Sequence, residues 1–267
     1  MTQTFESVNR AFSKQSAHFD NEDRENQILA DMREQIYAHV LRYLRPGNSI
    51  LELNAGTGID AFHFSSLGYT VLATDLSDGM IQQIQQKIAA HPENKNIRCK
   101  QLSYDRLDEL HGKKFDYVFS NFGGLNCIDN LANVTCHLPG LLAPRAHVTW
   151  VIMPPVCLWE MSSVLKGKFR SAFRRFTKDG VMAHLEGEYF KTYYFSLEEI
   201  KNAFGSKFEL VHAEGLGALS PQPHRGDFPK KYPSVYRALR KLDKATRHHF
   251  PFNRWADHLI VTFRYNG

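Results

Sequence analysis

The sequence predicts an α/β protein built on a doubly wound, mostly parallel sheet, and three observations support this prediction. Short apolar segments alternate with segments of helical period from residue 49 to residue 153. A glycine-rich turn at 54–58 follows the first of these apolar segments. The chain has 267 residues, 43% hydrophobic and 23% charged, which is enough chain of ordinary globular composition to bury a large core. A disordered or fibrous protein is therefore excluded.

The alternation begins with a helix and continues through repeated strand and helix units. The first helix is predicted at 21–44, because acids fill its first turn and apolar residues recur every four positions from Ile28 to Val40. After it we expect, in order, strand 49–53, helix 59–67, strand 69–74, a helix that follows Ser77, strands 97–102 and 115–119, helix 129–142 and strand 147–153. Parallel neighbours in a sheet need crossover connections, and these helices supply them.

The regular alternation stops at residue 154. Two irregular segments, 154–192 and 220–254, are interpreted as insertions on the same sheet, with a strand at 188–195 closing the first. Between them, Ser196 and Glu199 form a capping-box pattern that opens a helix to about residue 204. A strand at 208–215 follows that helix, and the final strand, 258–265, follows the second insertion. Residues 1–46 are interpreted as an N-terminal helical arm and 47–267 as one domain.

Several classes of protein are excluded by what the chain lacks. No segment approaches the about 18 unbroken apolar residues of a membrane span, and the best candidate, 148–159, is cut by Pro154 and Pro155. Residues 1–15 lack the basic region and apolar block of a secretory signal, so we expect a cytoplasmic protein. The four cysteines lie far apart without a C-x-x-C pair, so we expect reduced thiols and no metal site.

The most informative motif lies between the first strand and the helix that follows it. Gly56 and Gly58 leave the backbone open to a ligand, and ligands of open parallel sheets bind beyond the carboxyl ends of the strands. Asp75 ends the second strand 19 residues after Gly56, where an acid can accept hydrogen bonds from ribose hydroxyls. Because Gly56-x-Gly58-x-x-Ala61 also fits a loose dinucleotide fingerprint, the glycines alone do not separate a nicotinamide cofactor from an adenosyl cofactor.

Four further features separate the two cofactors. They are Glu52 near the end of the first strand, the continuation Asp75-Leu76-Ser77-x-x-Met80, the strand 115–118 that leads into Ser120-Asn121-Phe122-Gly123-Gly124, and the late final strand. Together they resemble the class I S-adenosylmethionine-dependent methyltransferases over about residues 5–153, and more loosely over the last two strands. The resemblance implies a Rossmann-like domain with a seven-stranded sheet whose last strand is antiparallel. It also implies S-adenosyl-L-methionine as cofactor and S-adenosyl-L-homocysteine as product.

The resemblance further implies which residues surround the cofactor. Asp75 would bind the ribose, Leu76 and Met80 would border the adenine, and residues 121–123 would lie beside the sulfonium. The full set implied is Phe19, Glu52, Asn54, Ala55, Gly56, Gly58, Asp75, Leu76, Met80, Leu102, Ser103, Asn121, Phe122 and Gly123. Asn54 departs from the pattern, since the family usually has a glycine there, but asparagine tolerates left-handed backbone conformations better than most residues.

The arm also resembles a feature of the small-molecule members of this family. In those proteins a helical segment ahead of the first strand, often with an aromatic-Asp pair, folds over the cofactor, and Ala17-His18-Phe19-Asp20 is similar. Such a lid would exclude water from the sulfonium. The alternative is that Phe19 only anchors a surface helix to the core.

The insertions carry the positive charge of the chain. The run 166–178 has six Lys or Arg and no acid, the stretch 221–254 has a net charge of +7, and the rest of the chain has a net charge of −8. These runs could be solvated helix faces, since 166, 170 and 174 would share one helical side, or they could bind an acidic small acceptor or a nucleic-acid backbone. Aromatic residues between the charges could line an acceptor pocket or pack the insertion onto the sheet.

A small organic acceptor, acidic or aromatic, is the preferred substrate. The sequence Asn121-Phe122-Gly123-Gly124 is not the N/D-P-P-Y/F type that methylates exocyclic base nitrogens, which disfavours nucleic acid. The candidates for a general base are His184, His224, Tyr193 and Tyr194, although for each the favoured interpretation is a polar residue of the surface or of the edge of the core. The rival functions are RNA methylation, nicotinamide oxidoreduction and a non-catalytic module that keeps the fold. The sequence does not determine the oligomeric state or the identity of the acceptor.

Overall fold

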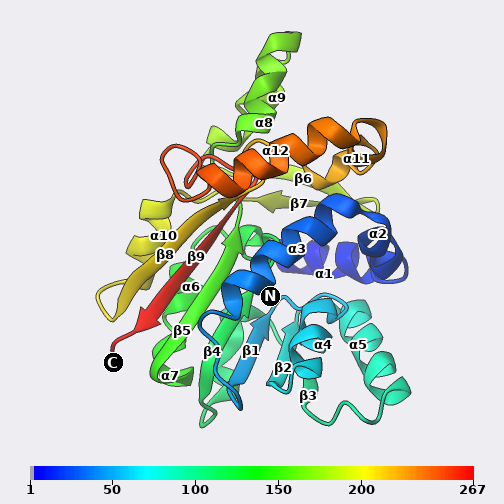
Figure 1. Cartoon of the computed structure of the whole chain (residues 1–267). Coiled ribbons are helices and arrows are strands. Elements are labelled where there is room, and N and C mark those ends of the chain that lie inside the picture. Colours follow the sequence, from blue (N-terminus) through cyan, green and yellow to red (C-terminus); the bar gives the residue numbers. More distant parts are fainter. Residues whose placement is uncertain (1–2) are drawn as a thin grey trace.

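The computed structural model describes residues 3–267. Seven strands form one sheet in the order β3-β2-β1-β4-β5-β9-β8, with helices on both faces (Figure 1). The strands are β1 (Ser49–Leu53), β2 (Thr70–Asp75), β3 (Ile97–Gln101), β4 (Phe115–Ser120), β5 (Leu142–Ile152), β8 (Phe208–Leu216) and β9 (His258–Tyr265). β9 is antiparallel to both of its neighbours, and the other pairs of this sheet are parallel. The prediction of a doubly wound, mostly parallel, seven-stranded sheet with an antiparallel last strand is confirmed.

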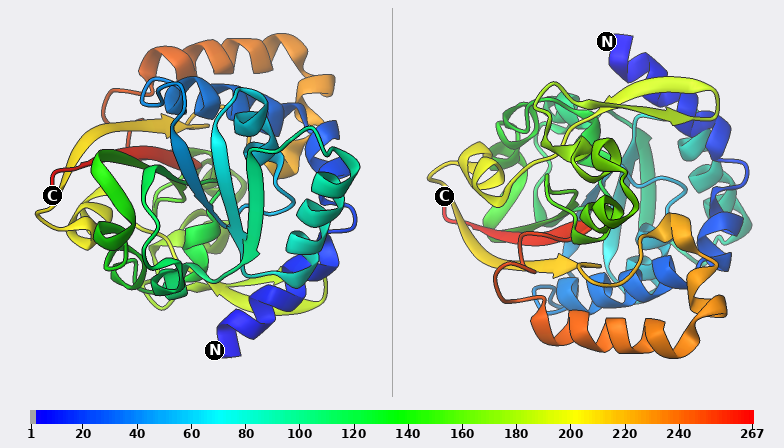
Figure 2. Two further views of the ribbon diagram at one scale, coloured as in Figure 1. Left: turned by 90° about the horizontal axis from the view of Figure 1, so that it is seen from below. Right: turned by 90° about the horizontal axis from the view of Figure 1, so that it is seen from above.

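The α-helices range in length from 4 to 14 residues. They are α1 (Gln3–Gln15), α2 (Phe19–Glu25), α3 (Gln27–Val40), α4 (Ile59–Ser66), α5 (Asp78–Ala90), α6 (Ala132–Thr135), α7 (Leu138–Leu141), α8 (Leu158–Met161), α9 (Phe169–Ala172), α10 (Leu197–Phe204), α11 (Phe228–Lys231) and α12 (Pro233–Thr246). Short 3₁₀ helices cover Tyr104–Leu110, Gly124–Cys127, Ser162–Lys166, Arg174–Phe176 and Pro223–Arg225. Figure 2 shows α1 crossing one end of the sheet and α12 running along one face.

Two of the predicted long helices are wrong in extent. The helix predicted at 21–44 is divided at Asn26, whose side-chain oxygen accepts hydrogen bonds from the N–H groups of Ile28 and Leu29 and so caps α3. The apolar stripe predicted for α3, from Ile28 to Val40, is buried against the sheet as expected. The helix predicted at 129–142 consists of α6 and α7, with Pro139 near the start of α7, and β5 begins directly after it.

A two-stranded hairpin adds an element that the sequence analysis missed. β6 (Val181–Leu185) pairs antiparallel with β7 (Glu188–Thr192), and the expectation of a single strand at 188–195 was therefore incomplete. The two residues between them, Glu186 and Gly187, have φ of 51° and 79°, which matches a tight turn of the primed type. α1 packs on β7, where Arg10 and Lys14 bind the carboxylate of Glu188 at 3.1 and 2.8 Å.

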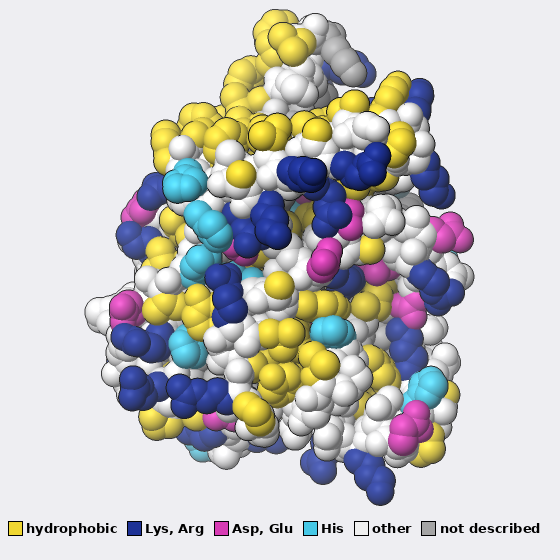
Figure 3. Space-filling view, in the orientation of Figure 1, with side chains coloured by type: hydrophobic (Ala, Val, Ile, Leu, Met, Phe, Trp, Pro, Cys, Tyr) yellow, Lys and Arg dark blue, Asp and Glu magenta, His cyan; other side chains and the backbone are white. Residues whose placement is uncertain are grey.

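The basic insertions lie together on one side of the molecule. In Figure 1, α8 and α9 project beyond the sheet and α12 crosses above β8 and β9. Lys and Arg side chains gather over α12 and the face beneath it, while hydrophobic side chains line its outer edge (Figure 3). The expectation that 166, 170 and 174 share one helical side is wrong, because Gly167, with φ of 69°, ends one short helix before α9 begins.

Among the described residues there is neither a helix that could cross a membrane nor a disulfide bond. No helix within 3–267 is both long and apolar enough to cross a membrane. In the same range the four cysteines, Cys99, Cys127, Cys136 and Cys157, are free thiols.

Candidate functional site

A cavity of about 320 Å³ opens beyond the carboxyl ends of β1, β2 and β4, where an open parallel sheet binds its ligands. Its lining is mostly apolar: Val8, Phe12, Phe19, Asn54, Gly56, Asp75, Leu76, Met80, Leu102, Tyr104, Asn121, Phe122, Gly123, Gly124, Cys127, Met153, Ala183, Phe190 and Thr192. All residues expected around a cofactor line this cavity except Glu52, Ala55, Gly58 and Ser103. The residues that the sequence pattern singled out therefore lie mostly around one continuous cavity.

The glycine turn forms the floor of the cavity, and Asn54 shapes it. Asn54 has φ of 47°, the left-handed conformation expected of a residue in place of glycine. Its side chain accepts a hydrogen bond from the Ser120 hydroxyl at 2.6 Å and donates one to the backbone oxygen of Asn121 at 3.0 Å. A Cβ at Gly124 would lie 2.2 Å from the Asn54 amide nitrogen, so only glycine fits there. Asn54 thus ties the turn after β1 to the loop after β4.

Asp75 is the one carboxylate in the cavity lining. It is buried at the end of β2 and accepts hydrogen bonds at 2.8 Å from the backbone N–H groups of Gly56 and Ser77. Burial raises the pKa of Asp75 to about 6, and these backbone donors only partly oppose that rise. Each oxygen still has a lone pair for another donor, so the carboxylate is suited to bind hydroxyl groups of a ligand.

A charged network behind the cavity was missed in the sequence. Arg33 of α3 is buried and forms ion pairs with Asp60 and, at 2.7 Å, with Asp23. Asp60 also accepts a hydrogen bond at 2.7 Å from the side chain of Asn121, and the Arg33 guanidinium lies 4.8 Å from the ring centre of Phe122. The network holds the loop after β4. The signal in the sequence was an arginine on the buried side of α3 and an acid directly after the glycine turn.

Phe122 and Glu52 are both held in unusual states. Phe122 has φ of 44°, a conformation that a bulky side chain adopts only where its surroundings impose it. Glu52 is buried at the end of β1, and its Oε2 has no hydrogen-bond partner among the described residues. Burial, reinforced by the nearby Asp60, raises the pKa of Glu52 well above its usual range. Glu52 lies behind the cavity wall, so it does not line the site directly.

The N-terminal arm and the β6–β7 hairpin roof the cavity. α1 contributes Val8 and Phe12, and the hairpin contributes Ala183, Phe190 and Thr192. These roof residues were not expected from the sequence, although the spacing of the apolar residues in α1 was a usable signal.

Phe19 lies over the glycine turn, since a Cβ at Gly56 would stand 3.8 Å from its ring. The neighbouring Asp20 accepts a hydrogen bond from the Thr57 hydroxyl and pairs with Lys87 of α5. The arm is thus fixed over the turn by one aromatic and one carboxylate contact.

None of the four candidate bases lines this cavity. His184 is exposed and stacks on Tyr189 with ring centres 4.5 Å apart. The ring of Tyr193 lies against Gly180, and the Arg175 guanidinium lies 5.0 Å from the ring centre of Tyr194. His224 lines a different pocket, and partial burial together with Arg225 lowers its pKa.

A second, open pocket of about 820 Å³ lies between the two insertions. Its lining is Trp159, Glu160, Ser162, Ser163, Lys168, Ser171, Arg174, Gln222, His224, Arg225, Asp227, Phe228, Lys231 and Tyr232. Of the aromatic residues that interleave with the charges of the first insertion, Phe169, Phe173 and Phe176 are exposed and do not line it. Phe190 instead lines the first cavity.

Two groups of side chains in the described range combine metal-ligand types. One contains His39, His212 and Glu214, and the other contains Cys157, Glu160 and Asp257. Arg247 already pairs with Glu214 at 3.2 Å, and Arg175 pairs with both carboxylates of the second group. Because guanidinium groups neutralise these carboxylates, neither group is assigned as a metal site.

Residues 50–145 match the family model of a methyltransferase domain. No curated protein matches the chain in sequence. An S-adenosylmethionine-dependent methyltransferase from Methanosarcina mazei is 14% identical, covers 85% of this chain and 96% of its own, and has a TM-score of 0.57. The CcbJ methyltransferase from Streptomyces caelestis is 16% identical over 89% and 90%, with a TM-score of 0.57. Geranyl diphosphate C-methyltransferase from Streptomyces coelicolor A3(2) is 9% identical over 87% and 79%, with a TM-score of 0.56.

At these low identities the solved structures establish a shared fold. The sheet order, the glycine turn between β1 and α4 and the cavity beyond the strand ends are those of a class I methyltransferase. Combined with the match of residues 50–145 to the methyltransferase-domain model, they indicate a methyltransferase domain with the fold of S-adenosylmethionine-dependent methyltransferases.

Proposed function

We propose that the protein transfers the methyl group of S-adenosyl-L-methionine to a small organic acceptor, with the cofactor bound in the cavity beyond β1, β2 and β4. The observation that carries this proposal is a single carboxylate, Asp75, in an otherwise apolar cavity that lies against the glycine turn. Ribose hydroxyls would supply the donors that this carboxylate lacks, and Leu76, Met80 and Leu102 would border the adenine. Phe122 and Gly123 would lie at the methyl-bearing end.

The cofactor, when bound, supplies an electrophilic methyl group. The protein's own contribution is to hold the acceptor in line and to exclude water. The roof formed by α1, Phe19 and the β6–β7 hairpin would perform the second task, so residues 1–46 act as a lid in this proposal. Free cysteines are compatible with work in the cytoplasm.

The enclosed roof favours a small acceptor over a macromolecule. Two proteins of the same fold have small acceptors in their names: the geranyl diphosphate C-methyltransferase, and a phosphoethanolamine N-methyltransferase from Haemonchus contortus that is 16% identical with a TM-score of 0.55. RNA methylation is the second candidate, because the insertions carry a net positive charge while the rest of the chain is net negative. Binding of RNA that weakens steeply with salt, together with methyl transfer to it, would replace our proposal.

Calorimetry with S-adenosylhomocysteine tests the cofactor site. We expect Asp75→Ala to weaken binding more than about tenfold, because it removes a charged acceptor for two hydroxyls. Asp179→Ala, which removes an exposed carboxylate outside the cavity lining, is the control and should bind as the unaltered protein does. An unchanged dissociation constant in folded Asp75→Ala would overturn the assignment.

Transfer of a labelled methyl group to a metabolite extract tests catalysis, with Asp75→Ala as the inactive reference. Labelled small products are the expected result. Binding of the cofactor product without any transfer to metabolites or RNA would support the non-catalytic alternative, and protection from thermal unfolding by NAD would support the oxidoreductase alternative.

A further inference from the structure

The second pocket has a surplus of positive charge that the protein itself does not neutralise. Lys168, Arg225 and Lys231 line it, and none of them forms an ion pair within residues 3–267. The partial burial that lowers the pKa of His224 keeps this histidine from adding to the charge at neutral pH. An open pocket lined by unpaired cations attracts anions and raises their local concentration.

The carboxylates of the pocket do not cancel this surplus. Glu160 receives bidentate hydrogen bonds at 2.7 Å from Arg174 and pairs with Arg175 at 2.7 Å. Although burial alone would raise it, the pKa of Glu160 is held at about 2 by these two arginines, so its charge is already matched. Asp227 is the only other acid of the lining.

Aromatic rings form the apolar part of the pocket. Trp159 and Phe228 meet edge to face with ring centres 5.9 Å apart, and Phe228 meets Tyr232 at 5.2 Å. Tyr232 remains 45% exposed although it lines the pocket, which leaves apolar surface for a ligand to cover. Rings beside cations are suited to a ligand that has a flat apolar body and an anionic group.

A short chain of contacts joins this pocket to the cofactor cavity. Gln222, in the pocket lining, donates a hydrogen bond to Asp257 at 2.7 Å, and Asp257 pairs with His258 at 3.0 Å. The His258 ring meets the ring of Phe122 edge to face at 5.9 Å, and Phe122 lines the cavity. The two spaces are therefore neighbours, and the side chains of Asp257 and His258 lie between Gln222 of the pocket and Phe122 of the cavity.

We propose that the pocket between the insertions binds the anionic part of the methyl acceptor, which is an aromatic or otherwise flat organic carboxylate or phosphate. This inference rests on the proposed function. The cofactor cavity, at about 320 Å³, lies at the lower end of the range of about 300–1,000 Å³ for ligand sites, and we therefore place the body of the acceptor in the neighbouring pocket. Arg225 and Lys231 hold the anionic group, and the reactive end points toward Phe122.

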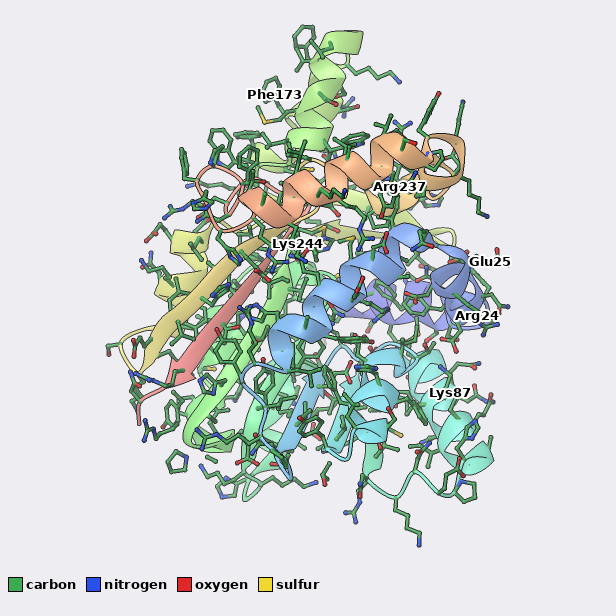
Figure 4. The ribbon with its side chains drawn as sticks, in the orientation of Figure 1. Arg24, Glu25, Lys87, Phe173, Arg237 and Lys244 are labelled. Atoms are coloured by element: carbon green, nitrogen blue, oxygen red, sulfur yellow. The ribbon has the colours of Figure 1, made fainter. Side chains whose placement is uncertain are left out.

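Fluorescence titration with phenyl phosphate tests the inference, because Trp159 lies in the pocket and reports on its occupation. We expect quenching by phenyl phosphate that is lost in Trp159→Phe, and at least tenfold weaker binding in the double variant Arg225→Gln/Lys231→Gln. Arg237→Gln/Lys244→Gln removes the same charge from α12 outside the pocket lining and should bind as before (Figure 4). Benzoate and inorganic phosphate, used as competitors, separate a carboxylate site from a phosphate site.

The outcomes distinguish this inference from the proposed function. Equal affinity in both double variants, or equal binding of neutral benzyl alcohol, would overturn the anion site while S-adenosylhomocysteine still binds. A protein that binds no S-adenosylhomocysteine would overturn the proposed function and the acceptor assignment with it. Tight binding of single-stranded RNA that phenyl phosphate does not displace would also contradict the inference. Once an acceptor is known, Arg225→Gln/Lys231→Gln should raise its KM at least tenfold with little change in kcat.

Discussion

The cofactor cavity and the pocket between the insertions are built in different ways. The floor of the cavity lies at the ends of regular strands, where a left-handed turn and one buried carboxylate create a mostly apolar site. The pocket is open, lined by charges, and formed by helices of three to five residues, such as α8 and α11. Helices this short are not stable alone, so tertiary contacts must hold them. Local backbone structure forms the first site, and a buried ion network forms the second.

That network is centred on Arg175, which is buried and joins the first insertion to Asp257, directly before β9, while Gln222 of the second insertion binds the same two carboxylates. It pairs with Asp257 at 2.8 Å and with Glu160 at 2.7 Å, and it donates to the backbone oxygen of Pro154. Although burial opposes it, the charges of His258 and Arg175 lower the pKa of Asp257. The insertion therefore depends on one guanidinium.

The largest expected effect comes from removing that guanidinium. Arg175→Leu removes the guanidinium that Glu160 and the buried Asp257 share, leaving Arg174 to the first and His258 to the second, and we expect a loss of about 3–5 kcal/mol in the free energy of unfolding. Urea unfolding measures it. Arg174→Leu is the matched control, because Arg174 is 46% exposed and its loss should cost less than about 1 kcal/mol. Similar losses in the two variants would show that the network does not hold the insertions.

The next effect concerns the floor of the cofactor cavity. Gly124→Ala would place a methyl group against the Asn54 side chain, so we expect a loss of about 1–3 kcal/mol in stability and weaker cofactor binding. Replacing Asn54 by Gly in the same chain removes the clash and should restore most of the loss. Thermal unfolding of the two single variants and the double variant measures this coupling. Additive losses would contradict the contact.

The third effect is a pH dependence of cofactor binding that comes from Asp75. Burial raises the pKa of Asp75 to about 6, so this group stabilises the fold below its unfolded pKa of 3.8 and loses that contribution as pH rises through about 6. The affinity for the cofactor depends on pH in the opposite direction and rises as Asp75 ionises, because hydroxyl groups donate best to the ionised carboxylate. Affinity for S-adenosylhomocysteine should fall up to about tenfold per pH unit below pH 6.

Calorimetry between pH 5 and pH 8 measures this dependence. The variant Asp75→Asn should bind S-adenosylhomocysteine weakly at every pH, with no change of affinity near pH 6. Phenyl phosphate binding at the second pocket should lack the Asp75 dependence. A flat profile for the unaltered protein would show that Asp75 does not bind the cofactor.

The smallest expected effect lies in the roof. Glu188→Gln removes the partner of Arg10 and Lys14, but both cations are more than half exposed, so cofactor affinity should change by no more than about fivefold. Glu198→Gln, on exposed α10, is the control and should have no effect. A large loss of affinity in Glu188→Gln would mean that this clamp, and not the apolar contacts of Phe12 and Phe190, holds the roof closed.

Much of the framework could be predicted from local pattern. Strand ends, the glycine turn and Asp75 were located because each depends on neighbouring residues in the chain. The break at Asn26 was missed because a side chain competes with the helix there. β6 was missed because none of its residues is fully buried, although the turn at Glu186 and Gly187 that joins it to β7 is local in the sequence. The candidate bases His184, Tyr193 and His224 do not line the cavity. They lie in segments whose sequence has no regular period, so their positions in the fold could not be predicted from local pattern.

By itself the sequence determined the class of fold, the position of the cofactor turn and the surplus of positive charge in the insertions. Periodicity and turn chemistry depend on short-range sterics and burial, which are present in the order of residues. Only the tertiary structure decided that Arg33 and Asp60 support the loop after β4, that α1 and the hairpin form the roof, and that Arg175 is structural while Arg225 and Lys231 face an open pocket. Whether a charge is paired depends on partners far along the chain, and folding alone brings them together.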